Sequence, residues 1–375
     1  MLENHRLKQI TTLQSQDRFP RFVGRNAHGK PQAYGAGNQI RVLTTDQGAQ
    51  GWATSHVPEE TLHPLIGQKI SDLFDLTHGT LNHALGIDQP LYDLVGCILN
   101  RPVYHLLGSK GSTSIPIYSG AIYFDDLEPE ATPRGISGVI TSCQQDYDAG
   151  YRAFKLKIGR GFKWTPPNDG LQRDIDVVCA VREHFPDSKI LIDANDAYTC
   201  DAFIQFLNGI ADCDLYWIEE PFQENETDLQ HLKDHMAKIG CCAYIAEGEG
   251  RKGAADPPGR YGGYTAEHID RLYDLASKKL IDAVVIDLDI VGFTRWRHIM
   301  PDLIQASILA SPHTWCWCVR SHYVAQLAAG LGNVICIEGI PGHSSALDYS
   351  HYPIHNGNIS VPDLPGFAMP IKEPA

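Results

Sequence analysis

The sequence lacks the features that mark several large classes of protein. No segment approaches 18 uninterrupted apolar residues, so we expect no membrane-spanning helix and no membrane partner. The first ten residues, MLENHRLKQI, lack the apolar core of a signal peptide. There is no tandem repeat, and 34 glycines and 23 prolines are too few for a fibrous or low-complexity chain. We therefore expect a globular protein that resides in the cytoplasm.

Positive charge and paired cysteines are also scarce. Lysines and arginines number 31 against 45 aspartates and glutamates, and the resulting net charge of −14 repels phosphate backbones. We therefore expect no nucleic acid partner. The ten cysteines include no CxxC pair, so we expect them to be reduced and mostly buried. With 43% apolar residues, the chain has enough material for a large core.

Short β-branched runs alternate with segments of helical period from about Ile115 onward, which is typical of consecutive βα units. Each candidate strand ends in a polar residue, and successive ends lie 25 to 38 residues apart, the length of one βα unit. These ends are Lys157, Asp193, Glu219, Glu249, Asp287, His313 and Glu338. A closed (β/α) barrel brings them to one face, whereas an open doubly wound sheet spreads them along a line. The pattern favours the barrel.

The two ends of the chain have different patterns. Residues 1–125 combine a glycine-rich start with segments in which Leu91, Leu94 and Ile98 follow helical spacing. The segment after about Leu347 is rich in proline, glycine and histidine. We predict an α/β protein: an α+β N-terminal domain at 1–125, a modified TIM (β/α) barrel at 126–345, and a C-terminal segment at 346–375 that packs on the first domain.

Three carboxylates, Asp193, Glu219 and Glu249, end three successive predicted strands. Oxygen ligands without cysteine or histidine suit Mg²⁺, which keeps positions open for water or substrate. A single carboxylate there is more often a helix cap or an ion-pair partner, but three in register favour a metal site. Because residues i and i+2 of a strand share a face, Glu247 remains an alternative to Glu249.

Two lysines, Lys155 and Lys157, lie on one face of the strand that precedes these carboxylates. Each ammonium group lowers the pKa of the other, and partial burial adds to the effect. A lysine with a pKa near neutrality can act as a general base. Taken alone, the motif is equally compatible with a solvated pair on a strand edge.

Asp287 and His313 end the next two strands. On neighbouring strands, the carboxylate would hydrogen-bond one imidazole nitrogen, orient the ring and favour its protonated form. A lone histidine in this context is usually a packed polar residue. Glu338, one unit further on, would complete the ring of polar groups and form a hydrogen bond at a developing oxyanion.

Together these motifs resemble the enolase superfamily, and within it the mandelate racemase subgroup, over nearly the whole chain. The resemblance rests on KLKIG, LIDAN, WIEEP, Gly248-Glu249, the Asp287 strand leading to Gly292, Pro312-His313 and the IEG around Glu338. The helix at 91–94 and the segment Pro102 to Gly108 resemble the capping domain of that family. The resemblance implies that residues 1–125 cap the barrel.

The resemblance also implies roles for individual residues. Asp193, Glu219 and Glu249 would hold Mg²⁺, and Asn195 would contact substrate or metal. Lys157 would be one base with Lys155 beside it, and the Asp287/His313 dyad would act from the opposite face. The sequence departs from the family at Phe293, where a second glycine is usual, and in an insertion at 251–265. Both departures are expected to reshape the substrate pocket.

Such a site suits removal of the proton α to a carboxylate through an enediolate. If His313 then donates a proton to a departing β-hydroxyl, a sugar acid (an aldonate or aldarate) becomes a 2-keto-3-deoxy acid. We expect this hydro-lyase reaction because acid-sugar dehydratases are common in the subgroup. The alternatives are a racemase or epimerase, in which His313 returns the proton to the α-carbon, and a non-catalytic barrel that binds sugar acids.

A basic and aromatic segment near the N-terminus, RFPRFVGR, is unusual in an acidic protein. The resemblance implies that a loop here closes over the barrel mouth. We predict that Arg18, Arg21 or Arg25 binds a distal carboxylate or hydroxyl groups of the substrate. Ion pairs between cap and barrel are an equally good interpretation of each arginine. A homo-oligomer is the general expectation for such enzymes.

Overall fold

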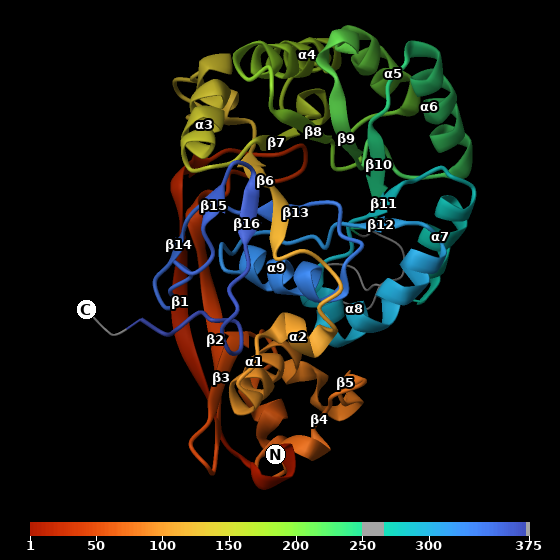
Figure 1. The fold of residues 1–375 in the computed structure, drawn as a ribbon. Helices are drawn as coiled ribbons and strands as arrows, with labels where there is room; N and C mark the ends of the chain where they lie inside the picture. Colours follow the sequence, from red (N-terminus) through yellow and green to blue (C-terminus); the bar gives the residue numbers. More distant parts are fainter. Residues whose placement is uncertain (250–265, 373–375) are drawn as a thin grey trace.

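A computed structural model describes residues 1–249 and 266–372. The N-terminal part contains an antiparallel sheet of β1 (Leu7–Val23), β2 (Ala33–Thr45) and β3 (Gln50–Thr54), with β4 (Phe74–Asp75) and β5 (Gly79–Thr80) in a separate hairpin. Helices α1 (Asp88–Leu99) and α2 (Val103–Leu107) follow, and α1 packs against β3 (Figure 1). A side chain at Gly51 of β3 would collide with the backbone of Leu94, so this close packing requires glycine.

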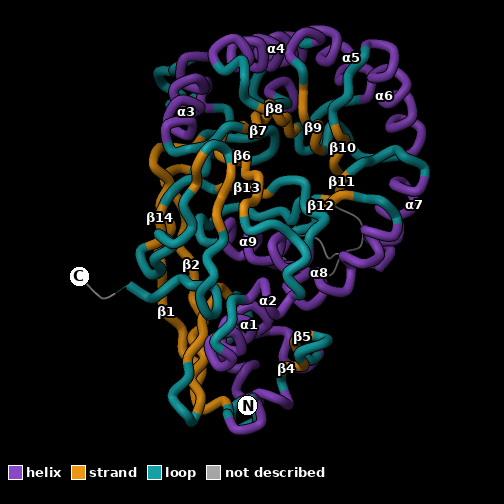
Figure 2. The backbone as a smooth tube through the Cα atoms, in the orientation of Figure 1, coloured by secondary structure: helices purple, strands orange, loops and turns teal. Residues whose placement is uncertain are grey.

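The remainder alternates between strands and helices. The order is β6 (Ser114–Ile122), α3 (Ile136–Asp148), β7 (Ala153–Lys157), α4 (Pro167–His184), β8 (Lys189–Asp193), α5 (Cys200–Gly209), β9 (Leu215–Glu219), α6 (Glu226–Ile239), β10 (Tyr244–Glu247), α7 (Ala266–Ser277), β11 (Ala283–Val284), α8 (Leu288–Gln305), β12 (Leu309–Ala310), α9 (Arg320–Leu331) and β13 (Ile337–Gly339). Figure 2 shows the helices outside the strands.

Parallel pairing closes this part into a barrel. Strands β6 to β12 pair in chain order, and β13 pairs with β6. A parallel bridge between Ala310 and Val334 joins β12 to the segment before β13, and another joins Asp287 to His313. The predicted barrel with a separate β-rich N-terminal part is therefore confirmed. All the ends that carry the predicted site residues lie on one rim.

Local sequence signals explain the helices around this barrel, as α6 illustrates. The side chain of Asn225 accepts a hydrogen bond from the backbone N–H of Asp228 at 2.9 Å and caps the first turn. Leu229, Leu232 and Met236 recur at helical spacing and are buried against the sheet. The helix ends at Gly240, which has φ of 72°, the left-handed conformation that favours glycine.

The pairing places the first barrel strand earlier than the predicted boundary. β6 begins at Ser114 and pairs with β7 and β13, so the division that we drew between residues 125 and 126 falls after this strand. The change of pattern at about Ile115 marks the start of this strand, whereas residue 125, at which we drew the boundary, follows its end.

The C-terminal segment contacts both parts of the molecule. Strands β15 (Ile354–His355) and β16 (Asn358–Ser360) form a hairpin that pairs antiparallel with β6. Further on, the indole N–H of Trp52 donates to the carbonyl of Met369 at 2.7 Å, and the backbone N–H of Phe367 donates to Asp93 at 2.6 Å. Strand β14 (His343–Ser344) also pairs with β1.

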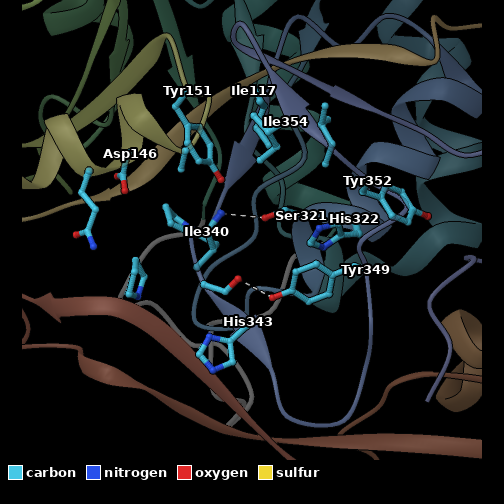
Figure 3. Close-up of a pocket in the computed structure, with 16 residues that line it drawn as sticks. Ile117, Asp146, Tyr151, Ser321, His322, Ile340, His343, Tyr349, Tyr352 and Ile354 are labelled. Carbon is cyan, nitrogen blue, oxygen red and sulfur yellow. Dashed lines mark hydrogen bonds between the residues drawn. The ribbon is translucent and has the colours of Figure 1, made fainter. Parts of the chain in front are cut away.

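A cavity of about 480 Å³ lies between the helix layer and this C-terminal segment (Figure 3). Its walls include the end of α3, the start of α9 and the hairpin residue Ile354. His322 and Tyr349 stack in one wall with ring centroids 4.1 Å apart.

In the described part of the chain, no helix is long and apolar enough to cross a membrane.

Candidate active site

Three carboxylates converge at the rim of the barrel. Asp193 is the last residue of β8 and pairs in register with Glu219, the last residue of β9. Glu249 follows β10 by two residues. One oxygen from each lies within 4.8 Å of the others. Asp193 and Glu219 are buried and Glu249 is partly buried, so the structure brings together the three residues that the sequence singled out.

The backbone at Gly248 decides which glutamate joins this cluster. Ala246 packs inside the barrel, so the next residue of the strand, Glu247, faces the other side. Gly248 has φ of 122° and ends the regular alternation, and Glu249 then turns to the rim. The parity argument that kept Glu247 as an alternative ligand was wrong, because β10 ends before residue 249.

Lys155 lies beneath the carboxylates, fully buried. Its Nζ is 2.6 Å from Oε1 of Glu219 and 3.3 Å from oxygens of both Asp193 and Glu338. Burial alone would lower the pKa of Lys155, but Glu219 and Glu338 outweigh it and raise this pKa well above its usual value. Lys155 thus holds three acidic side chains in place.

Lys157 lies two residues further along β7 and donates a hydrogen bond to Oδ2 of Asp193. Burial lowers its pKa and the charge of Asp193 raises it, with a net increase. The lowered pKa that the sequence predicted for both lysines is therefore wrong. The mutual repulsion of two ammonium groups is smaller than their attraction to carboxylates contributed by other strands.

His313 and Asp287 form the predicted dyad. Nδ1 of His313 lies 3.1 Å from Oδ2 of Asp287, and Nε2 lies 2.9 Å from Oε1 of Glu249 and 3.6 Å from Oε2 of Glu338. Burial would lower the pKa of His313, but these carboxylates, Glu249 foremost, raise it well above its usual value. The backbone N–H of Asp289 donates to Oδ1 of Asp287 at 2.7 Å and fixes the carboxylate.

Glu338 lies between Lys155 and the Asp287/His313 dyad. One of its oxygens faces Lys155, and the other accepts the backbone N–H of Thr314 at 3.3 Å. A side chain at Gly120 on β6 would occupy the position of the Glu338 carboxylate. Glycine at 120 therefore makes room for an acidic group at the end of β13.

The loop after β1 reaches the rim and contacts Asn195. Oδ1 of Asn195 accepts from Nδ2 of Asn26 at 3.1 Å, and its carbonyl oxygen lies 2.5 Å from Nε2 of His28. The backbone N–H of Asn195 in turn donates to Oδ1 of Asp193 at 2.9 Å. Asn195 thus links the N-terminal loop to a carboxylate of the cluster. Asn26 and His28 belong to no motif, and the sequence offered no signal for them.

The three arginines of the N-terminal segment are not directed at the carboxylate cluster. Arg21 pairs through both Nη atoms with Asp146 on α3. The guanidinium of Arg25 lies 2.6 Å from Glu128 and 3.3 Å from Glu130. Ion pairs between the two parts of the molecule, the interpretation that we weighed against substrate binding, therefore describe both residues. Arg18 is exposed on β1, where its backbone pairs with His343.

Aromatic side chains that the sequence analysis missed form a wall beside Lys157. Tyr123 stacks on Trp315 with centroids 4.7 Å apart, and Trp315 stacks on Phe19 at 6.0 Å. Nζ of Lys157 lies 5.4 Å from the centre of the Tyr123 ring. These residues come from β1, the end of β6 and the segment after His313, so no local pattern connects them.

The two departures from the family pattern have different outcomes. Phe293 is buried with its ring 5.4 Å from those of Tyr92 and Phe367, so it packs between the barrel, α1 and the C-terminal segment. Its predicted effect on the pocket is therefore not a direct contact with the carboxylate cluster. The insertion at 251–265 lies outside the described residues.

The donor set fits a hard divalent cation. Three carboxylate oxygens from three strands approach one point, and no histidine or cysteine belongs to the group. Carboxylates alone favour Mg²⁺ over softer metals. The three acids concentrate negative charge at the rim, and lysine and histidine side chains around them partly balance it.

Comparisons with known proteins agree with this geometry. Residues 138–252 match the family described as enolase C-terminal domain-like. The chain is 35% identical to a 3,6-anhydro-alpha-L-galactonate cycloisomerase of Streptomyces coelicolor over 136 residues, which cover 36% of this chain and 33% of that protein.

Two solved structures match nearly the whole chain. One is galacturonate dehydratase from Geobacillus sp., complexed with D-galacturonate and 5-keto-4-deoxy-D-galacturonate, with a TM-score of 0.87 and 28% identity over 99% of this chain and 96% of that one. The other is a mandelate racemase/muconate lactonizing protein from Geobacillus sp. Y412MC10 complexed with magnesium and tartrate, with a TM-score of 0.87 and 28% identity over 99% and 94%. The predicted resemblance to the enolase superfamily is therefore confirmed by the match of residues 138–252 and by the fold of nearly the whole chain.

Proposed function

We propose that this protein is a Mg²⁺-dependent dehydratase of a sugar acid. The observation that carries the proposal is the convergence of Asp193, Glu219 and Glu249 on one point, with Lys157 bonded to one side of the cluster and His313 to the other. The solved relative that was crystallised with magnesium supports the choice of metal.

The three carboxylates would hold the cation at the rim of the barrel. When bound, Mg²⁺ supplies a Lewis acid that stabilises negative charge on the carboxylate oxygens of the substrate. Lys157 is placed to remove the proton α to that carboxylate, which leaves an enediolate. A cation held by Asp193 would oppose the pull of this carboxylate on the lysine and lower the lysine pKa toward the neutral, basic form. Lys155 acts as a positioning residue, because it ties Glu219, Asp193 and Glu338 into one arrangement.

His313 completes the elimination from the opposite flank. Asp287 orients the imidazole through Nδ1, so Nε2 faces the cluster. The charged imidazolium donates its proton to the departing β-hydroxyl, and water leaves. The resulting enol tautomerises to a keto acid whose keto group is next to the carboxylate.

The substrate class follows from the chemistry and from one relative. In the product named for the Geobacillus dehydratase, the keto and deoxy carbons are neighbours, as elimination beside a carboxylate requires. We therefore propose an aldonate, aldarate or uronate as the substrate. Trp315, the partly exposed member of the aromatic stack with Phe19 and Tyr123, offers a surface for its carbon backbone.

A racemase or epimerase is the second candidate. A base on each flank of the same carbon also suits removal of a proton on one side and its return on the other, and the relative described as a mandelate racemase/muconate lactonizing protein fits that class. The non-catalytic barrel is disfavoured, because a binding protein has no need of Lys157 and a hydrogen-bonded Asp287/His313 dyad.

A screen of aldonic, aldaric and uronic acids with Mg²⁺ tests the proposal. Semicarbazide detects a keto acid, and NMR in deuterated water detects loss of the α-proton. Keto-acid formation from at least one compound supports the dehydratase. Exchange without keto acid shows a racemase or epimerase, and binding with neither signal overturns both enzymatic proposals.

A further inference from the structure

Two cysteine side chains meet on the outside of the barrel, near the ends of the strands that lie opposite the carboxylate cluster. Sγ of Cys179, on α4, lies 3.5 Å from Sγ of Cys213, in the turn Ala211–Cys213 that precedes β9. Cys213 is buried and Cys179 is half-buried. β9 starts two residues after Cys213 and carries Glu219 at its other end, so the pair lies toward the end of the barrel opposite the carboxylate cluster.

Hydrogen bonds beside the two cysteines hold the turn that carries Cys213 against α4. Arg182 lies one turn after Cys179 on α4, and its Nε donates to the carbonyl of Cys213 at 2.9 Å. Nη2 of the same guanidinium donates to the carbonyl of Asp214 at 3.1 Å. The turn is therefore fastened to the helix on which its partner cysteine lies, independently of the sulfur atoms.

We propose that Cys179 and Cys213 are a redox modification site that forms a disulfide by exchange with a small-molecule disulfide such as oxidised glutathione. A disulfide bond is about 2.05 Å long, so the sulfur atoms need to approach by roughly 1.5 Å. Side-chain rotation can supply such a shift. The proposal is independent of the reaction at the rim and goes beyond it.

The exchange proceeds in two balanced steps. The half-buried Cys179, as thiolate, attacks one sulfur of glutathione disulfide, the glutathione S–S bond breaks, and one glutathione thiol leaves. Cys213 then loses its proton and attacks Sγ of Cys179, which releases the second glutathione. Two cysteine thiols are oxidised, and one glutathione disulfide is reduced to two thiols.

The environment of each cysteine supports this order. Burial, and then the contact with Cys179, raise the pKa of Cys213 to about 12, so it is a poor first nucleophile. Cys179 is the more accessible of the two. Once it carries glutathione, its sulfur lies within reach of the buried thiol, and the second step becomes intramolecular.

The expected consequence is higher stability under oxidising conditions. The link would close a loop between positions 34 residues apart and restrict the unfolded chain. It would also add a covalent link between the turn before β9 and α4 to the hydrogen bonds of Arg182. Because the cluster of Asp193, Glu219 and Glu249 lies at the other ends of the strands, binding of Mg²⁺ there should be unchanged.

The test uses the full-length protein, incubated with glutathione disulfide, blocked with an alkylating reagent and digested without reduction. We expect mass spectrometry to find one peptide pair joined through Cys179 and Cys213, and dithiothreitol to reverse the link. The melting temperature of the oxidised protein should rise by several degrees. Cys179→Ser should abolish the link and the rise, and Cys242→Ser, which removes an exposed thiol, should abolish neither.

Two outcomes would overturn the proposal. One is that Cys179 carries only glutathione, with no link to Cys213. The other is that Cys213 joins a different cysteine, such as Cys241, in the wild-type protein. Cys179→Ala provides a second substitution at a half-buried position and keeps the test decisive if the serine variant does not fold.

Discussion

Nε2 of His313 and Oε1 of Glu249 face each other across 2.9 Å at the rim of the barrel. We propose His313 as the general acid and Glu249 as the third metal ligand. The contact places the proton-transfer group and the metal site within one small volume, although 63 residues of sequence separate the pair. A substrate carboxylate at the metal would therefore lie next to the imidazole.

Replacing this ligand should weaken the binding of Mg²⁺. In Glu249→Gln, one of three anionic oxygens is lost, and we expect the affinity for Mg²⁺ to fall by at least ~100-fold. Isothermal titration calorimetry measures the change. The matched control is Glu247→Gln, because Glu247 lies on the other face of the strand. Equal losses in both variants would contradict our assignment of Glu249.

The two bases should make separable contributions. In Lys157→Met, we expect α-proton exchange to fall by about 10²- to 10⁴-fold, since the group that removes the proton is absent. In His313→Asn, dehydration should fall by a similar factor while exchange through Lys157 persists. NMR in deuterated water follows exchange, and semicarbazide follows the keto acid. Loss of exchange in His313→Asn alone would reverse the two roles.

A buried ion-pair network next to β7 should contribute strongly to the free energy of unfolding. Arg160 is fully buried, with Nη2 at 2.6 Å from Asp126 and Nη1 at 2.5 Å from Asp174. Arg160→Met leaves both carboxylates buried without their partner, and we expect the free energy of unfolding to fall by about 3 to 5 kcal/mol. Urea denaturation measures it.

An exposed ion pair provides the control for that experiment. Lys278 pairs with Glu226 at 2.7 Å, with both side chains largely in solvent. Lys278→Met should leave the free energy of unfolding nearly unchanged, because solvent screens an exposed pair. A loss in Arg160→Met no larger than that in Lys278→Met would show that the buried network does not stabilise the fold.

Stability should depend on pH through His322, in the wall of the cavity of Figure 3. Burial lowers the pKa of His322 to about 4 from its usual value near 6.5. The unfolded chain therefore binds a proton that the folded chain does not, and stability falls as the pH decreases from about 6.5 to about 4. The loss from this residue is at most ~3 kcal/mol.

His322→Phe isolates this contribution, because phenylalanine retains a ring against Tyr349 and cannot be protonated. Urea denaturation of both proteins between about pH 7 and about pH 4.5 should show a shallower decline in the variant. The lost hydrogen bond to the carbonyl of Val319 affects all pH values alike. Parallel curves for the two proteins would rule out His322 as the source.

Much of the barrel could be predicted from the sequence because its strands end in polar residues at regular intervals. Asp193, Glu219 and His313 occupy the predicted ends because each signal is local: a buried apolar run followed by one charged or polar group. Strand parity could not separate Glu247 from Glu249, and the reason is local as well. The strand ends at Glu247, and the positive φ of Gly248 changes the direction of the next side chain.

Other features depend on partners that are distant in sequence. The raised pKa of Lys155 comes from Glu219 and Glu338 on other strands, which a strand pattern does not connect to it. Likewise, the partners of Arg21 and Arg25 are Asp146 and Glu128, more than 100 residues away and without any motif. Charge pairing across the fold, rather than local periodicity, determines these interactions.

The central claim is that Asp193, Glu219 and Glu249 bind one divalent cation between them. A crystal grown with Mn²⁺ in place of Mg²⁺ tests it most directly, because anomalous scattering locates the metal. The account predicts one manganese peak bonded to an oxygen of each of the three residues. A peak bonded elsewhere, or three carboxylates that share no metal at saturating Mn²⁺, would contradict it.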